Sequence, residues 1–281
     1  MTDAVLYDEK EGVARLTLNR PARRNALDGE MIEALVAAFG RLRGAAHVRV
    51  IVLTGAGDRV FCAGGDLAGG DPAGKNSVGG DMAGGHPAES PVGWHNTSLA
   101  DHYARGRFVD LFHAMAAVGR PIVVVVQGHA LGGGFGLAMA GDVVIAAERA
   151  CFGTPEIGVG LFPMMIMPIL ARYLPRRKLL EMMMTGERLS ARDALSLGIV
   201  NQVVPSDRLQ AAADVFIRKL LDKSPAALRL GRDAFYATLD LDEDRALRYL
   251  HSQLTLALMT DDAAEGISAF LHKRPPRWTG R

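Results

Sequence analysis

Glycine clusters follow two of the most apolar stretches of the chain. Residues 61–66, FCAGGD, come shortly after the run at 50–54, and the glycines at 132–134 come after Ile122–Val126. Such apolar, β-branched runs predict buried strands. Glycines let the backbone approach a ligand closely, and N–H groups at the start of a helix have no internal partner. Two such loops could aim two N–H groups at one oxygen and stabilise negative charge there.

A carboxylate stands in a comparable place. Glu156 follows Pro155 after a third apolar run, Val143–Ala147, and another apolar loop comes next. An apolar setting raises the pKa of a carboxyl group, which suits it to accept and return a proton near neutral pH. The setting therefore suits Glu156 to proton transfer, the simpler alternative being a glutamate that closes a turn.

The elements that must position these groups change in kind along the chain. Alternating residues at 5–7 and Val13–Leu18 predict a hairpin, and Asp28 is expected to cap a helix. Helical spacing of apolar residues predicts helices over 29–43, 99–118, 136–140, 207–222, 225–239, 243–260 and 262–272. The chain thus changes from β/α to all-α near residue 205.

Composition excludes several classes of protein. The 281 residues are 49% hydrophobic with a net charge of +1, so no basic excess predicts nucleic-acid binding. No apolar run approaches the length of a membrane span, and residues 1–11 lack the apolar core of a signal peptide. Cys62 and Cys151 suit a reducing compartment, which favours a cytoplasmic protein with no membrane partner.

Other kinds of glycine-rich site need residues that this chain lacks after its glycines. A dinucleotide site needs a glycine where Leu137 stands, and no P-loop lysine and serine are present. No nucleophile for a serine peptidase lies between 132 and 140. The spacing of His, Cys and Asp predicts no metal site.

Taken in order, the motifs resemble those of the crotonase family, the enoyl-CoA hydratase/isomerase superfamily. The matching pieces span nearly the whole chain: Asn19-Arg20-Pro21 with Asn25-Ala26-Leu27, FCAGGDL (61–67), GHALGGGFGLAMAGD (128–142), FGTPEIGVGLFP (152–163), MMTGERLSARDALSLGIVNQVVP (183–205) and AFLHKRPPRWTG (269–280). Any one glycine-rich piece is weak evidence, whereas the ordered set is specific.

The resemblance implies an α/β fold, a crotonase-like ββα spiral over 1–205 with a C-terminal helical region over 206–281. That region is implied to cover the site and to build a homotrimer or hexamer. The implied substrate is an acyl-CoA thioester, with no cofactor besides the coenzyme A that the substrate carries. A glycine-rich stretch, 68–98, is expected to be a flexible insertion, either a lid over the acyl pocket or a surface loop.

The resemblance also implies roles for individual residues. The N–H groups of Gly65 and Gly133 would polarise the thioester carbonyl, and Glu156 would move the proton. Contacts with the substrate or its CoA moiety are implied for Arg23, Arg24, Ala26, Ala63, Asp66, Leu67, Gly132, Gly136, Pro155 and Lys273, with Arg274 beside Lys273. A solvated loop and an exposed basic tail are the simpler explanations of these basic residues.

One position departs from the family pattern. Hydratases of the family hold a water between two glutamates, one in a GGG-x-E motif and one in the Pro-Glu step. Here Gly136 stands at the first position and Glu156 at the second. One carboxylate cannot readily be both base and acid to one water, yet it can carry a proton between two carbons. The sequence favours an enoyl-CoA isomerase over a hydratase with a second acid from elsewhere, or over a non-catalytic acyl-CoA-binding protein.

Overall fold

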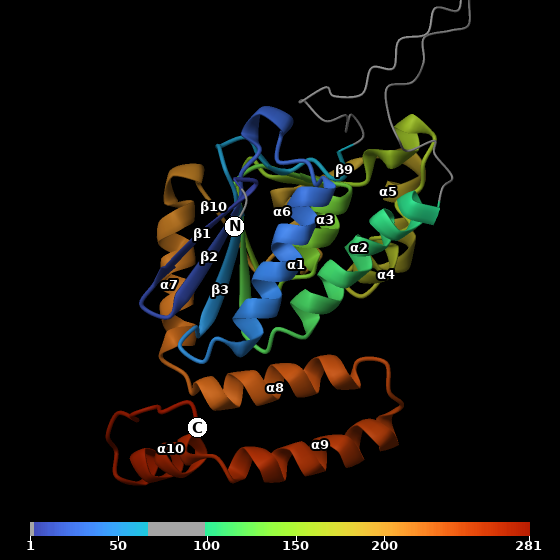
Figure 1. Cartoon of the computed structure of the whole chain (residues 1–281). Helices are drawn as coiled ribbons and strands as arrows, with labels where there is room; N and C mark the ends of the chain where they lie inside the picture. Colours follow the sequence, from blue (N-terminus) through green and yellow to red (C-terminus); the bar gives the residue numbers. More distant parts are fainter. Residues whose placement is uncertain (1–2, 67–98) are drawn as a thin grey trace, which may run out of the picture.

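Two β-sheets carry the loops that hold the glycines and the glutamate (Figure 1). The computed structural model describes residues 3–66 and 99–281, with 99–105 as backbone. Leu67 and the expected insertion at 68–98 lie outside the described residues. The larger sheet has the order β1-β2-β3-β5-β7-β10 and the smaller one the order β4-β6-β8-β9.

The central strands of the larger sheet are buried on both faces. Its first two strands form the expected antiparallel hairpin and the others run parallel: β1 (Val5–Lys10), β2 (Val13–Leu18), β3 (Val50–Gly55), β5 (Ile122–Val126), β7 (Val143–Ala147) and β10 (Gln202–Val204). Alternate residues of β3 point into different hydrophobic cores. Ile51 and Leu53 belong to one core, and Val50 and Val52 belong to the other. Burial of both faces explains why β3, β5 and β7 read as nearly unbroken apolar runs.

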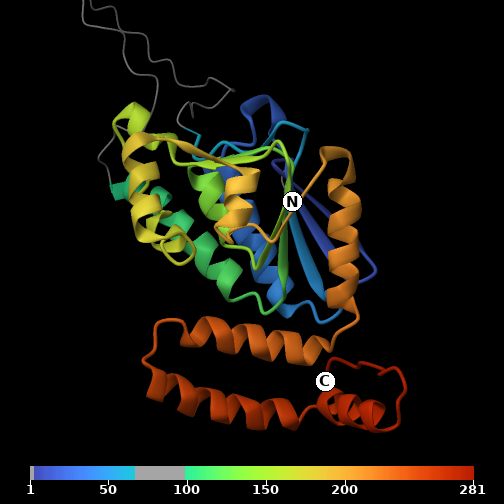
Figure 2. The same ribbon diagram turned by 180° about the vertical axis from the view of Figure 1, so that it is seen from behind.

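Helices cover the two faces of this sheet (Figures 1 and 2). One face carries α1 (Gly29–Gly44), α2 (Leu99–Ala116) and α3 (Gly133–Met139), and the other carries α7 (Leu209–Leu221) after the short η3 (Ser206–Arg208). Asp28 caps α1 as expected, since its carboxylate accepts a hydrogen bond from Met31 N at 2.9 Å. Among the described residues, no helix is long and apolar enough to cross a membrane.

The smaller sheet consists of four three-residue strands: β4 (Val60–Cys62), β6 (His129–Leu131), β8 (Cys151–Gly153) and β9 (Arg188–Ser190). The first three follow β3, β5 and β7 almost directly, whereas β9 follows a helix. The other short elements are η1 (Pro21–Arg23), η2 (Pro155–Val159), α4 (Met167–Leu170), α5 (Arg176–Thr185) and α6 (Ala191–Ser196). Strands of three residues are too short to show a period, so the sequence did not reveal them.

The last three helices, α8 (Pro225–Thr238), α9 (Glu243–Leu258) and α10 (Asp261–Leu271), extend away from the sheets at one end of the molecule (Figures 1 and 2). Asp142 at the start of β7 holds α8 by an ion pair with Arg232 Nε at 2.8 Å and a hydrogen bond from Tyr236 Oη at 2.7 Å. The predicted boundary at residue 205, between a ββα core and a helical region, stays a prediction. The first helix after it, α7, packs against the larger sheet.

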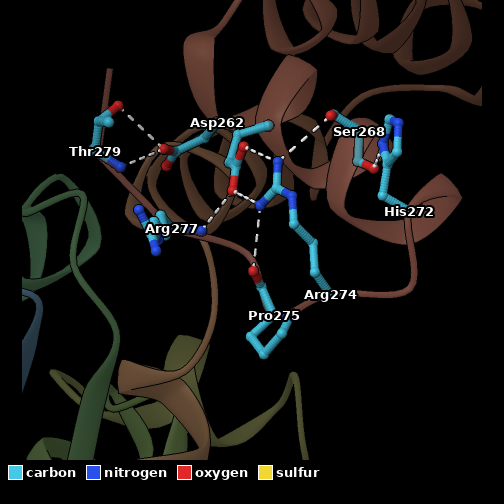
Figure 3. A network of polar contacts seen from close by, with 8 residues as sticks. Asp262, Ser268, His272, Arg274, Pro275, Arg277 and Thr279 are labelled. Carbon is cyan, nitrogen blue, oxygen red and sulfur yellow. Dashed lines mark hydrogen bonds and ion pairs between the residues drawn. The ribbon is translucent and has the colours of Figure 1, made fainter.

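The C-terminal tail is tied back to these helices (Figure 3). Asp262 accepts hydrogen bonds from Ser224 Oγ at 2.7 Å, Thr279 N at 2.7 Å and Gly280 N at 3.0 Å. Glu265 pairs with Arg274 at 2.6 Å. The tail is therefore part of the folded structure.

Candidate active site

The two glycine loops meet through their backbones. A Cβ atom built on Gly64 would lie 3.1 Å from Gly133 N, and one built on Gly133 would lie 3.6 Å from Gly65 N. The contact at Gly64 is tight, and Gly64 has a φ of +97°, which side chains rarely adopt. The backbone N–H groups of Gly65 and Gly133 therefore lie near each other.

The N–H of Gly65 points away from Leu27, the residue with which Gly65 is paired. Gly65 forms a parallel bridge with Leu27, made by Leu27 N to Gly64 O at 2.7 Å and by Asp66 N to Leu27 O at 2.9 Å. In this pattern the N–H of Gly65 itself faces the opposite side. Within the described part of the chain it donates no backbone hydrogen bond outside regular elements, so it is available to an acceptor.

Gly133 is the first residue of α3, three residues earlier than the helix expected over 136–140. Glycine is a poor helix former, which hid this first turn in the sequence. Glycine is needed in this turn because its backbone packs closely against β4. A Cβ on Gly134 would stand 2.4 Å from Cys62 O. A first-turn N–H has no partner within its own helix, so the N–H of Gly133 is also available.

Glu156 lies at the same helix end. A Cβ on Gly132 would stand 2.8 Å from Glu156 Oε1, so the carboxyl group rests against Gly132. Gly132 N donates to Gly153 O at 2.9 Å, which fixes the loop before α3 to the strand that leads into Pro155 and Glu156. Burial raises the pKa of Glu156, outweighing a hydrogen bond with its own backbone, and its Oε2 is buried without a hydrogen-bond partner among the described residues.

The position of the missing glutamate is closed by a side chain. A Cβ on Gly136 would stand 2.2 Å from Ile166 Cγ2, 2.8 Å from Ile166 Cβ and 3.5 Å from Phe112 Cζ. The glycine at 136 is thus required by its neighbours. No group of three or more His, Cys, Asp or Glu side chains in the described ranges could hold a metal ion.

Comparison with known proteins agrees with the motifs. The family described as Enoyl-CoA hydratase/isomerase matches residues 8–80 and 92–281. The chain belongs to this family. A relative named carnitinyl-CoA dehydratase, from Salmonella typhi, is 32% identical over 289 residues and the match covers 100% of both chains.

Solved structures of the crotonase family share the fold. The enoyl-CoA hydratase of Mycobacterium smegmatis superposes with a TM-score of 0.87 at 32% identity, covering 98% of each chain. The enoyl-CoA hydratase of Bacillus anthracis has a TM-score of 0.85 at 28% identity, covering 99% of this chain and 100% of its own. The predicted α/β crotonase-like fold is confirmed.

Several predicted contact residues surround this crotonase-family site. Ala63 N donates to Arg24 O at 3.1 Å, which joins the η1 loop to the Gly65 loop. Ala26 is buried, whereas the side chains of Arg23 and Arg24 are exposed. Pro155 is the first residue of η2 and presents Glu156. Contact of these residues with a substrate stays a prediction.

Of two other predicted contact residues, Asp66 forms an ion pair within the protein and Lys273 lies far from the glycine loops. The Asp66 carboxylate pairs with Arg20 at 2.9 Å, and Arg20 also binds Asp28 at 3.0 Å. Lys273 follows α10, and Figure 1 shows α10 at the opposite end of the molecule from the short blue helix η1. Its own chain therefore does not bring Lys273 to the glycine loops.

Sequence reasoning missed two apolar residues of the site. A Cβ on Gly133 would stand 3.2 Å from Phe108 Cε1, which places this partly buried ring beside the N–H pair. Phe108 and Phe112 are one helical turn apart on α2, with ring centroids 6.3 Å apart, and that spacing was the available signal. Ile166 gave none, because its contact with Gly136 joins distant parts of the sequence.

Proposed function

We propose that the chain is an acyl-CoA enzyme that shifts a double bond along an enoyl chain with Glu156 as its proton carrier. The observation that carries this proposal is the partly buried carboxyl group of Glu156, which lies against Gly132 beside the two available N–H groups, while Ile166 closes position 136 to a second carboxylate. The alternative chemistry, addition of water, needs both a base and an acid at that water.

The shift begins with the substrate thioester oxygen accepting hydrogen bonds from the N–H groups of Gly65 and Gly133. The ionised Glu156 removes a proton from C2 of a 3-enoyl thioester, and the electron pair moves onto the thioester oxygen as an enolate conjugated with the double bond. The protonated Glu156 then returns the proton to C4, which leaves the double bond between C2 and C3. Each donor of such a pair is worth about 3 kcal/mol in the transition state.

The raised pKa of Glu156 supports this cycle. A carboxylate that ionises in the ordinary range is a weak base, whereas burial brings its proton affinity closer to that of the carbon acid it must serve. The partly buried ring of Phe108 beside Gly133 helps to keep water from the N–H pair, where a drier setting strengthens both hydrogen bonds.

Hydration or dehydration is the second candidate, because the relatives are named carnitinyl-CoA dehydratase and enoyl-CoA hydratase. It requires a second acid from elsewhere in the chain. A protein that binds acyl-CoA without turnover is the third candidate.

Coenzyme A is proposed to enter as part of the substrate in a cytoplasmic enzyme, with no separate cofactor. Arg24, whose backbone O accepts a hydrogen bond from Ala63 N, and its neighbour Arg23 have exposed side chains, which suit the phosphates of coenzyme A. Lys273 would contribute from another copy of the chain. The proposed homotrimer or hexamer is supported by exposed apolar side chains on the last helices, among them Phe270, 82% exposed, and Met259 at the end of α9, 76% exposed.

Two assays on the wild type and Glu156→Gln test the proposal. We expect conversion of a 3-enoyl-CoA to the 2-enoyl form, little hydration of a 2-enoyl-CoA, and a fall in isomerisation of about 100-fold or more in the variant. Glu187→Gln, at an exposed glutamate, is the matched control. Strong hydration by the wild type would replace the isomerase assignment, and bound acyl-CoA without turnover would support a binding protein.

A further inference from the structure

We propose, building on the double-bond shift above, that Ile166 is a specificity-determining residue that limits this site to one carboxylate. Ile166 lies just before α4 and is 2% exposed. It fills the space into which any side chain at position 136 would first project, and so decides which chemistry α3 can support.

The contact is too close for adjustment by a few tenths of an ångström. A Cβ on Gly136 would stand 2.2 Å from Ile166 Cγ2 and 2.8 Å from its Cβ, whereas real Cβ contacts below 3.0 Å are essentially never seen. The Ile166 Cβ is tied to the backbone, and a β-branched side chain has few rotamers. Phe112 Cζ, at 3.5 Å from the same point, limits the other side.

Direction matters as much as closeness. Helical side chains tilt toward the N-terminus of their helix. Gly136 lies one turn after Gly132, to whose carbonyl its N–H donates at 3.1 Å. A glutamate at 136 would therefore extend toward Gly132, against which Glu156 rests. Two carboxylates there could hold one water between them, as addition of water requires.

A stability cycle tests the steric part. Gly136→Ala is expected to lower the melting temperature of the wild type, and to lower it less when Ile166→Gly is also present. Leu170→Gly is the matched control, because Leu170 is similarly buried one turn along α4. The same cost of Gly136→Ala in all three backgrounds would overturn the role of Ile166.

A gain of function tests the chemical part. Gly136→Glu with Ile166→Gly is expected to hydrate a 2-enoyl-CoA about tenfold or more faster than the wild type, and Gly136→Glu with Leu170→Gly is expected to show no gain. Equal hydration by Gly136→Glu alone, or a folded double variant with no gain, would overturn the inference. If Gly136→Glu prevents folding in every background, including Ile166→Gly, that also overturns it.

These outcomes are separate from those of the function itself. A wild type without isomerase activity would remove the double-bond shift, whereas the melting temperatures of the Gly136→Ala series would still decide whether Ile166 closes position 136. An active isomerase with no thermal coupling between the two positions would remove Ile166 and leave the double-bond shift intact.

Discussion

The carboxyl group of Glu156 rests against Gly132, whose missing side chain would begin 2.8 Å from Glu156 Oε1. Gly132 also has a φ of +52° and a ψ of −127°, a conformation that glycine alone adopts readily. Gly132 therefore serves two purposes: it turns the chain into α3, and it leaves the space in which the carboxylate sits beside the N–H of Gly133.

Gly132→Ala is expected to impair both stability and turnover. The new Cβ would push the Glu156 carboxyl group aside, and the backbone would be strained by roughly 1–3 kcal/mol. We expect a fall in the unfolding free energy of that size, measured in urea, and a fall in kcat of about tenfold or more. Gly158→Ala is the control, because no atom of the described residues beyond its own stretch of chain lies within 4 Å of its Cβ position; similar losses there would refute this account of Gly132.

Glu156→Gln is expected to stabilise the protein at neutral pH. Burial raises the pKa of Glu156 in the folded state, so the fold favours the neutral form. The wild type therefore keeps its full stability below the unfolded-state pKa of about 4.3 and loses some as pH rises through the raised folded-state pKa. Glutamine stays neutral, so near neutral pH the unfolding free energy of the variant should exceed that of the wild type by roughly 1 kcal/mol. Its melting temperature should rise accordingly.

Thermal unfolding across the acid-to-neutral range measures this difference. It should shrink in acid and vanish well below about pH 4, where Glu156 is protonated in both the folded and the unfolded state. Glu187→Gln, at an exposed site, should show no such dependence. A variant less stable than the wild type at neutrality would mean that an unseen partner stabilises the ionised Glu156.

The pH dependence of catalysis should report the same group. As a base, Glu156 must be ionised, so kcat/KM should fall on the acid side with a midpoint above the ordinary glutamate value of about 4.3. The residual activity of Glu156→Gln should lack this limb. A limb in the ordinary range, or one retained by the variant, would assign the titration to another residue.

Some elements could be predicted because their signals are local. Ile122–Val126 and Val143–Ala147 were expected with the bounds observed, since burial on both faces leaves unbroken apolar runs. The Pro155-Glu156 pair, and the glycine at position 136 where hydratases of the family have a glutamate, could be recognised because the family motifs fix their spacing. The three-residue strands carried no period, and the first turn of α3 was hidden by its glycines.

Contacts between distant residues could not be predicted. Nothing in the sequence around Gly136 indicates that Ile166 fills the space beside it, or that Phe108 lies against Gly133. Asp66 is predicted to contact the substrate beside Gly65, and only the fold shows its pairing with Arg20. Such pairings depend on how the loops of two sheets meet, which no single segment encodes.

Asp66→Asn is expected to lower stability more than catalysis. The Asp66 side chain is 7% exposed and pairs with Arg20 at 2.9 Å, which fixes the loop that presents Gly65. Losing this partner should cost about 1–2 kcal/mol of unfolding free energy, because Asp28 still faces the arginine. Asp58→Asn, at an exposed turn, is the control. A fall in kcat of about 100-fold with unchanged stability would instead make Asp66 a catalytic acid.

Asp262→Asn is expected to loosen the C-terminal tail in a pH-dependent way. Burial alone would raise the pKa of Asp262, but hydrogen bonds from Ser224, Thr279, Gly280 and Ala226 outweigh it and lower the pKa. A lowered folded-state pKa gives stability that is present above the unfolded-state value, about 3.9, and is lost as pH falls through the folded-state pKa.

The variant should therefore unfold more easily than the wild type at neutrality, by roughly 1–3 kcal/mol, and the difference should shrink in acid. Hydrogen exchange should show the tail N–H groups of Thr279 and Gly280, which donate to Asp262, losing protection before the sheet does. Asp261→Asn is the matched control, since this neighbouring side chain is exposed. Equal protection of the tail in both variants would show that Glu265 and Arg274, joined at 2.6 Å, hold it without Asp262.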